Sequence, residues 1–483
     1  MSSSASGPIG RPDAIHAIVR NVVDTRYEDL SRKAVDATKT FILDSLGVAI
    51  AGSLAPGVSE TLGVLCDWGG KKESTVLVSG ERLPAPSSAM MNSFLINNQE
   101  FDCVHDLAVV HAFTTVLPVA LAVAESQGGV TGRELLTAVA LGVDVASSIG
   151  ISSRSPIAHF RPGTAGAFGA VAAAGKVAGF DQTTLSDAMG IVSSQISGTL
   201  QPHSEGAQVN SIQTGFNARA AVTAISLASR GIQGASEVLE GRYGYFRLYE
   251  GEYDVEETLA NLGKVWQVER IGHKPYPCGR LTHGAIEAAL ALKESHRFDA
   301  GDIDEIEVLA PPLVYRLVGR PLGDGVLSPQ YAKLTIPFVV AVALIRGTVF
   351  INDFWEEQLR DTAVHELAGR IKVVQDLTIT DENISVPLWE RIRLKNGAEH
   401  ELTLDQVLGH PDKPLSHEQH LAKFRACWAA GASHLPESNR DQLVEIVDGL
   451  EVVPSGEEIM RLLGPQGGRQ RTAAPGNKRP GFR

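Results

Sequence analysis

Helix-spaced segments built largely from small residues follow one another from about residue 13 to residue 235. Alanine, glycine, serine and valine dominate these segments, and such residues let helix backbones approach one another closely. The clearest segments are residues 32–51, 118–127, 132–149, 166–178 and 217–230. Their apolar periodicity predicts a large helical domain with tight contacts between its helices.

After about residue 265 the pattern becomes that of a mixed α and β domain. Asn396-Gly397 separates two alternating runs, which is a strong signal for a β-hairpin. Strands are predicted at residues 303–310, 369–375, 390–395 and 400–404. The apolar segments 283–292 and 335–345 are predicted to be helices that lie beside this sheet.

Helical patterns return near the end of the chain, and we expect them to pack back onto the helical domain. The predicted fold class is therefore mainly α, with a large all-helical domain and a smaller α+β lid domain inserted into it. The last residues are rich in glycine, proline and arginine and contain no acid, which predicts a disordered tail. The predicted units are residues 11–265 (helical), 266–408 (α+β lid), 409–464 (returning helices) and 465–483 (tail).

Composition excludes several classes of protein. A formal net charge of −13 over 483 residues argues against nucleic acid as the main partner. The four cysteines are widely scattered, which argues against a zinc site, an iron–sulfur cluster or a disulfide framework. Scattered cysteines also favour a reducing compartment. We find no signal-peptide pattern and no apolar run of membrane length, so a cytoplasmic protein without a membrane partner is expected.

The segment from residue 100 to residue 111 concentrates titratable groups between two apolar stretches. Its three carboxylates and two imidazoles belong to Glu100, Asp102, Asp106, His105 and His111. Groups that titrate near pH 4 and near pH 6.5, placed together in a partly dry setting, suit general acid–base catalysis. The alternative interpretation is a capped loop of solvated acids with one core histidine.

Two further segments carry candidate carboxylate-binding groups. His159 and Arg161 precede a Gly/Ala-rich helix, whose N-terminus would add a partial positive charge. Gln208 opens a second segment, which leads to Arg219. Each arginine can equally cap a helix or pair with an acid.

The loop from residue 273 to residue 283 is fixed by two prolines and a glycine, so its side chains are aimed. It carries Lys274, Cys278 and His283. Cys278 is more simply a small buried hydrophobe than a nucleophile, since no base adjoins it in sequence. His283 is more simply a packed helix histidine than a catalytic base.

Taken together, seven collinear motifs resemble the MmgE/PrpD family over about residues 13 to 460. They are FILDSLGVAIAG (41–52), EFDCVHD…H…VLP (100–118), HFRPGTAGAFGAVAAAGKVAGFD (159–181), GFNARAA (215–221), LEGRYGYF (239–246), KPYPCGRLTHGAIEAAL (274–290) and YAKLTIPFVVAVAL (331–344). The family includes 2-methylcitrate dehydratases, cis-aconitate decarboxylases and an iminodisuccinate epimerase.

The resemblance implies a homodimer with a site between its two domains, which acts on di- or tricarboxylates without a metal or other cofactor. It implies that Glu100, Asp102 and His111 are catalytic, with either His159 or Arg161 in the family's second histidine position. We expect His105, Arg161, Arg219, Lys274, Gln208, Cys278 and His283 to bind substrate.

Three departures from the family pattern bear on the reaction. Cys103 stands where the family usually has a second acid. Asn210 stands where many relatives have a lysine, and Gly279 stands where the pattern of the animal decarboxylase has a histidine. The best single prediction is a lyase of the 2-methylcitrate dehydratase type. A decarboxylase, an epimerase and a repurposed or non-catalytic relative are the alternatives.

Overall fold

The computed structural model describes residues 11–323 and 327–464, and helices dominate it. Three helices form the centre of the helical domain: α5 (Ala112–Ser126), α6 (Gly132–Ser152) and α7 (Arg161–Val177). A Cβ atom built on Gly142 would lie 2.7 Å from the carbonyl oxygen of Gly169, and one on Gly169 would lie 2.4 Å from that of Gly142. The small residues noted in the sequence therefore permit the close crossing of α6 and α7.

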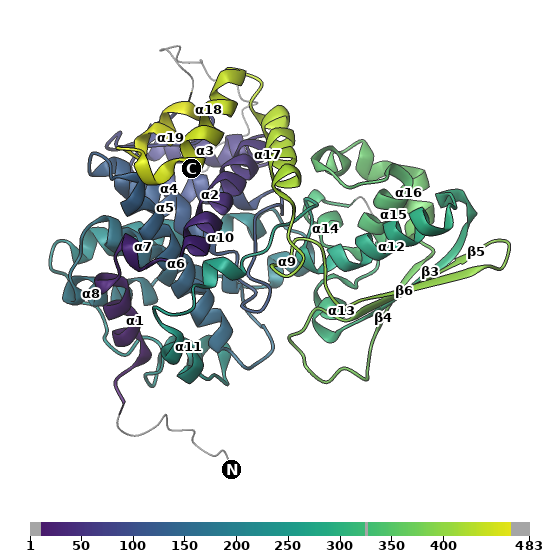
Figure 1. The fold of residues 1–483 in the computed structure, drawn as a ribbon, viewed down its shortest axis with the longest axis horizontal. Coiled ribbons are helices and arrows are strands. Elements are labelled where there is room, and N and C mark those ends of the chain that lie inside the picture. The colour runs from purple at the N-terminus through teal and green to yellow at the C-terminus, as the bar shows by residue number, and fades with distance from the viewer. Residues whose placement is uncertain (1–10, 324–326, 465–483) are drawn as a thin grey trace, which may run out of the picture.

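The other helices of this domain surround that centre (Figure 1). They are α1 (Ala14–Asp24), α2 (Arg32–Gly52), α3 (Val58–Trp68), α4 (Ala85–Asn97), α8 (Gln182–Ser193), α9 (Gln201–Glu205), α10 (Val209–Ala228) and α11 (Glu256–Asn261). A short antiparallel pair, β1 (Ser74–Thr75) and β2 (Arg82–Leu83), lies at the edge.

The α+β domain holds a four-stranded sheet in the order β4-β3-β5-β6. Its strands are β3 (Ile303–Ala310), β4 (Ile371–Gln375), β5 (Leu388–Leu394) and β6 (Glu399–Leu404). In this sheet β3 and β4 are parallel, whereas the β3–β5 and β5–β6 pairs are antiparallel. Its helices are α12 (His283–His296), α13 (Pro312–Val318), α14 (Pro329–Lys333), α15 (Ile336–Arg346) and α16 (Thr362–Ala368), and α12 and α15 cover one face of the sheet (Figure 1).

The C-terminal helices return to the helical domain. They are α17 (His417–Gly431), α18 (Glu437–Asp448) and α19 (Glu457–Leu462). α17 packs against α2 so closely that a Cβ on Gly431 would lie 1.9 Å from the carbonyl oxygen of Ile50. Most buried hydrophobic residues accordingly fall into two large clusters, one in each domain.

The two segments that connect the domains are hydrogen-bonded to each other. The backbone N–H of His273, on the outgoing segment, donates to the carbonyl oxygen of Gly409 on the returning segment at 2.9 Å. Gly409 has φ +93°, and a Cβ there would lie 2.2 Å from the carbonyl oxygen of His273. Glycine is thus required where the connections meet.

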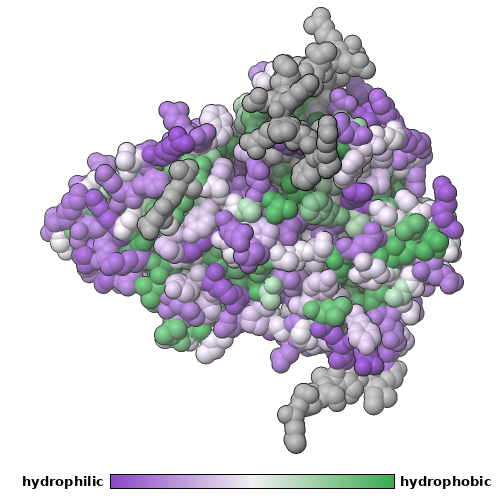
Figure 2. Space-filling view, turned by 180° about the vertical axis from the view of Figure 1, so that it is seen from behind, coloured by the Kyte–Doolittle hydropathy of each residue, from purple (hydrophilic) through white to green (hydrophobic). Residues whose placement is uncertain are grey.

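The predicted hairpin and the four predicted strands are confirmed with small shifts at their ends. Three predicted helix starts are too late: α5 begins at Ala112, α7 at Arg161 and α10 at Val209, against predicted starts at residues 118, 166 and 217, and Pro118 lies inside α5 rather than at its first turn. Among the described residues, one helix, α6, is long and apolar enough to span a membrane, but 94% of its most apolar window is buried inside the protein. This is the pattern of a core helix. Seen from behind, hydrophilic residues cover much of the narrower α+β end of the molecule (Figure 2).

The predicted tail at residues 465–483 lies outside the described residues.

Candidate active site

A cavity with an empty volume of about 810 Å³, part of it open to solvent, lies between the two domains. The helical domain contributes Glu100 and His111 to its wall, and the α+β domain contributes Arg280 and Leu317. A position between domains is a common place for a small-molecule site.

His111 and Asp102 form a pair at this cavity. His111 precedes the first residue of α5, and its Nδ1 lies 3.1 Å from Oδ2 of the fully buried Asp102. The same carboxylate oxygen accepts hydrogen bonds from Thr114 Oγ1 at 2.6 Å and from Asn97 Nδ2 at 3.1 Å. Asp102 is therefore fixed from three sides, and it orients the ring of His111.

Lys274 lies beneath this pair and is completely buried. Its Nζ is 3.1 Å from Oε2 of Glu100 and 3.5 Å from Oδ1 of Asp102. Burial opposes ionisation of Asp102, but His111 and Lys274 outweigh it and hold the pKa of Asp102 below its ordinary value. Burial likewise disfavours the charged lysine, yet the two carboxylates raise the pKa of Lys274. One cation thus serves two carboxylates.

Arg280 places a second cation at the cavity. Its Nε and Nη2 each donate to the carboxylate of Asp106 at 3.1 Å, and its Nη1 donates to the carbonyl oxygen of Leu408 at 2.8 Å. Among the described residues, Arg280 is the only lysine or arginine that lines the cavity. Its other N–H groups donate to the carbonyl oxygens of His273 and Val407, both at 3.5 Å, so Arg280 acts on an anionic ligand through its positive charge rather than through a free donor.

His203 and Asn210 also line the cavity, from α9 and α10. Burial, reinforced by Arg320, lowers the pKa of His203 to about 4, so this imidazole is neutral near pH 7. The Oδ1 atoms of Asn97 and Asn210 are buried and receive no hydrogen bond among the described residues. Two acceptors at the cavity therefore await a donor.

His159 and Arg161 lie outside the cavity wall. Arg161 donates from Nε and Nη2 to the two carboxylate oxygens of Glu250 at 2.9 and 2.8 Å. His159 Nε2 lies 3.2 Å from the hydroxyl of Tyr245 and 3.4 Å from Oε1 of Glu250. Both basic side chains are therefore engaged by one carboxylate that the sequence analysis did not consider.

Three other predicted binding residues are held inside the protein. His105 shares a contact of 3.2 Å with Gln267 and accepts from the N–H of Ala108, and burial lowers the pKa of His105 to about 4. Burial raises the pKa of Cys278 to about 12, so it is a thiol rather than a nucleophile. His283 is fully buried beside the carbonyl oxygen of Cys278. None of the three lines the cavity.

Two predicted binding residues lie on the surface. Arg219 is exposed and stacks over the ring of Trp68, with its guanidinium carbon 4.7 Å from the ring centroid. Gln208 is exposed at the start of α10. The expected clamp of Arg161, Arg219 and Lys274 is therefore not formed: one binds Glu250, one faces solvent, and one lies beneath Asp102.

Arg280, Asn97 and His203 line the cavity but are not among the predicted site residues. Arg280 lies in the proline-fixed loop whose basic side chains are expected to be aimed, so the sequence does carry a signal for it. Asn97 stands three residues before Glu100 and donates to Asp102, so its place beside the acidic segment is a signal as well. His203 has none, because α9 reaches the cavity only through packing against distant segments.

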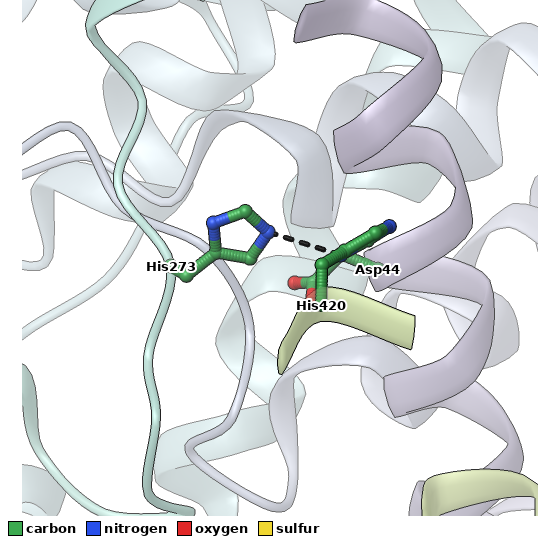
Figure 3. A group of neighbouring side chains, drawn as sticks. All are labelled: Asp44, His273 and His420. Atoms are coloured by element: carbon green, nitrogen blue, oxygen red, sulfur yellow. Dashed lines mark hydrogen bonds between the residues drawn. The ribbon is translucent and has the colours of Figure 1, made fainter. Parts of the chain in front are cut away.

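One group near the site has side chains of metal-ligand type. Potential ligand atoms of Asp44, His273 and His420 all lie within 4.8 Å of one another (Figure 3). Lys423 Nζ is 2.7 Å from Oδ1 of Asp44, where it already supplies the positive charge. His273 Nε2 and His420 Nδ1 are 3.1 Å apart and share a hydrogen bond. We interpret this group as a polar network that fixes the start of the loop carrying Lys274.

Comparison with known proteins agrees with this architecture. Residues 16–258 match the MmgE/PrpD N-terminal domain, and residues 276–451 match the MmgE/PrpD C-terminal domain. The cis-aconitate decarboxylase of Mus musculus is 26% identical over 454 residues, which is 91% of each chain. That of Aspergillus terreus is 25% identical over 459 residues, covering 90% of this chain and 93% of its own. The matched domains span most of the sequence, and this chain belongs to the MmgE/PrpD family.

Proposed function

We propose that this protein is a lyase that acts on a polycarboxylate, with His111 as the group that transfers the proton. The observation that carries the proposal is the His111–Asp102 pair at the interdomain cavity, with Lys274 beneath it. Asp102 next to Nδ1 leaves Nε2 as the nitrogen that exchanges a proton with the ligand. Asp102 also stabilises the imidazolium that forms when His111 takes up that proton.

Decarboxylation is the first candidate reaction. The relatives compared above are named cis-aconitate decarboxylases, which supports loss of carbon dioxide from an unsaturated acid. In that reaction the C–C bond to the departing carboxylate breaks, and its electron pair is delocalised toward a remaining carboxyl group. Protonated His111 then gives its proton to carbon and is reprotonated from solvent, while the positive charge of Arg280 attracts a remaining carboxylate.

Dehydration is the second candidate, and the free oxygen of Asn97 favours it. Asn97 Nδ2 donates to Asp102, which leaves Oδ1 as an acceptor with no donor among the described residues. A substrate hydroxyl supplies such a donor, whereas a carboxylate does not. His111 would then remove a proton from carbon as the C–O bond breaks, and the proton held by His111 together with the departing hydroxide makes up the water that is released.

The test is NMR of the protein with cis-aconitate, citrate and 2-methylcitrate in deuterated water. Decarboxylation releases carbon dioxide and leaves one solvent deuterium on carbon, dehydration gives an alkene, and epimerisation exchanges deuterium without loss of mass. His111→Asn is the matched inactive variant. Turnover of none of these acids and no deuterium exchange would overturn the proposed proton transfer for this substrate set.

A further inference from the structure

Most of the cavity wall is apolar, although a site for a small polycarboxylate alone would present mainly donors and cations. The apolar wall consists chiefly of Phe160, Leu200, Leu281, Leu313, Leu317 and Leu334. These residues come from five separate segments in both domains. The two lining carboxylates are already paired, Glu100 with Lys274 and Asp106 with Arg280. The wall therefore offers few polar contacts beyond the groups around His111 and Arg280.

The residues around the start of α7 show how the apolar wall is built. His159 and Arg161 bind Glu250, whereas the alternate residues Phe160 and Pro162 line the cavity. The basic side chains of His159 and Arg161 therefore do not reach the cavity, and the apolar side chains of Phe160 and Pro162 form its wall here.

In the loop from residue 273 to residue 283, Gly279 packs closely against Leu334. A Cβ on Gly279 would lie 2.8 Å from Cδ2 of Leu334 and 3.6 Å from Cγ1 of Val318. No larger side chain fits at Gly279 unless Leu334 moves. The leucine consequently keeps its place on the wall.

Several wall residues remain partly uncovered. Leu200, Leu281 and Leu317 are only partly buried, unlike the leucines of the two cores. Val109, also on the wall, is β-branched yet has φ +51°, a backbone conformation that such residues rarely adopt. Strain of this kind concentrates at ligand sites. Apolar surface left facing a cavity gains contacts when a hydrocarbon fills it.

We propose that the substrate is a polycarboxylate with an alkyl chain several carbons longer than the methyl group of 2-methylcitrate, and that this chain lies against the apolar wall. Its carboxylates meet Arg280 near His111, and its chain contacts Leu200 from the helical domain and Leu317 from the α+β domain. This inference rests on the proposed function, because His111 and Arg280 fix the reacting end. It adds the chemical class of the remainder of the substrate.

The first experiment measures kcat/KM for one polycarboxylate series that bears hydrogen, methyl, butyl or hexyl at the same carbon. Each methylene that enters the apolar wall is expected to raise kcat/KM about fourfold until the wall is filled. A kcat/KM that stays flat or falls with chain length would overturn the inference while leaving the proposed reaction intact.

The second experiment places a polar group on each side of the wall. Leu200→Gln and Leu317→Gln should each lower the ratio of hexyl to methyl kcat/KM by about tenfold or more. Leu377→Gln is the matched control, because Leu377 is 82% exposed on the α+β domain. Circular dichroism checks that each variant folds. Unchanged ratios in both folded wall variants would contradict the assignment.

A binding series separates this inference from the proposed reaction. Calorimetry with succinates that bear methyl, butyl or hexyl chains should show affinity rising with chain length and an increasingly negative heat-capacity change. If that trend holds while no acid is turned over, the proposed reaction fails and the apolar subsite stands. If affinity is independent of chain length, the subsite is refuted whatever the turnover.

Discussion

Two buried clusters of similar composition lie in the helical domain, and only one of them reaches the cavity. The open cluster contains Glu100, Asp102, His111 and Lys274, and the closed cluster contains His159, Arg161, Tyr245 and Glu250. Each combines carboxylate, imidazole and cation within hydrogen-bonding distance. His111 lines the cavity, whereas His159 is enclosed by Tyr245 and Tyr249. Whether a cluster can act on a ligand therefore depends on whether it borders the cavity, and the residue types in the cluster do not reveal this.

The clusters also differ in their balance of charge. In the open cluster one lysine serves two carboxylates, so an excess negative charge remains to stabilise a proton taken up by His111. In the closed cluster Arg161 matches Glu250 one for one. Such a balanced pair suits a structural role.

The sharpest way to break this comparison is to remove each imidazole in turn. His111→Asn should lower kcat/KM by two to four orders of magnitude, the usual contribution of a general acid or base. His159→Gln, which keeps a donor for Glu250, should change kcat/KM by less than about threefold. Steady-state kinetics on folded variants checks both. Equal losses would erase the distinction between the clusters.

Removal of the cations tests the charge balance. Lys274→Met and Arg161→Met should each lower the free energy of unfolding by about 3–5 kcal/mol, because each leaves buried carboxylate unpaired. Urea titration measures the loss. Adding Glu250→Gln should restore most of the stability of Arg161→Met. Adding Glu100→Gln to Lys274→Met should restore only part of the stability that Lys274→Met loses, since Asp102 remains charged.

Acid should act on the closed cluster through Glu250. Burial raises the pKa of Glu250, but His159 and Arg161 outweigh it and lower this pKa from 4.5 to about 2. The resulting stability is fully present above pH 4.5 and is lost as the pH falls toward 2. Unfolding titrations should show that Glu250→Gln flattens the pH dependence in this window by up to about 1.4 kcal/mol per pH unit. An unchanged slope would mean that Glu250 is not strongly paired.

The smallest expected effect compares two arginines. Arg280→Met should raise KM by roughly tenfold or more, because it removes the positive charge from the cavity wall and leaves the negative charge of Asp106 unpaired there. Arg219→Met, its matched control on the surface, should leave KM within about twofold. Both constants come from initial-rate measurements. A larger effect at Arg219 would restore the clamp expected from the sequence.

Local patterns predicted the parts of this molecule that depend on neighbours in sequence. The small-residue helices, the Asn-Gly hairpin and the grouping of Glu100, Asp102 and His111 all arise within short segments. The direction of Arg161 could not be predicted in this way, because it depends on Glu250, 89 residues further along the chain. The position of His203 depends on how α9 packs beside the α+β domain, for which residues 201–205 carry no signal.

The hydrogen bond between His273 and Gly409 has a consequence for recombination. The two segments that connect the α+β domain to the helical domain lie side by side at His273 and Gly409. The α+β domain can therefore be exchanged with that of a relative by two crossovers that lie close together in the structure. Such a chimera would keep His111 and Asp102 but would receive new residues in place of Leu281, Leu313, Leu317 and Leu334. Substrate choice could then diverge by exchange of one module while His111 and Asp102 stayed in the other, provided that the incoming module kept a lysine at position 274, just past His273.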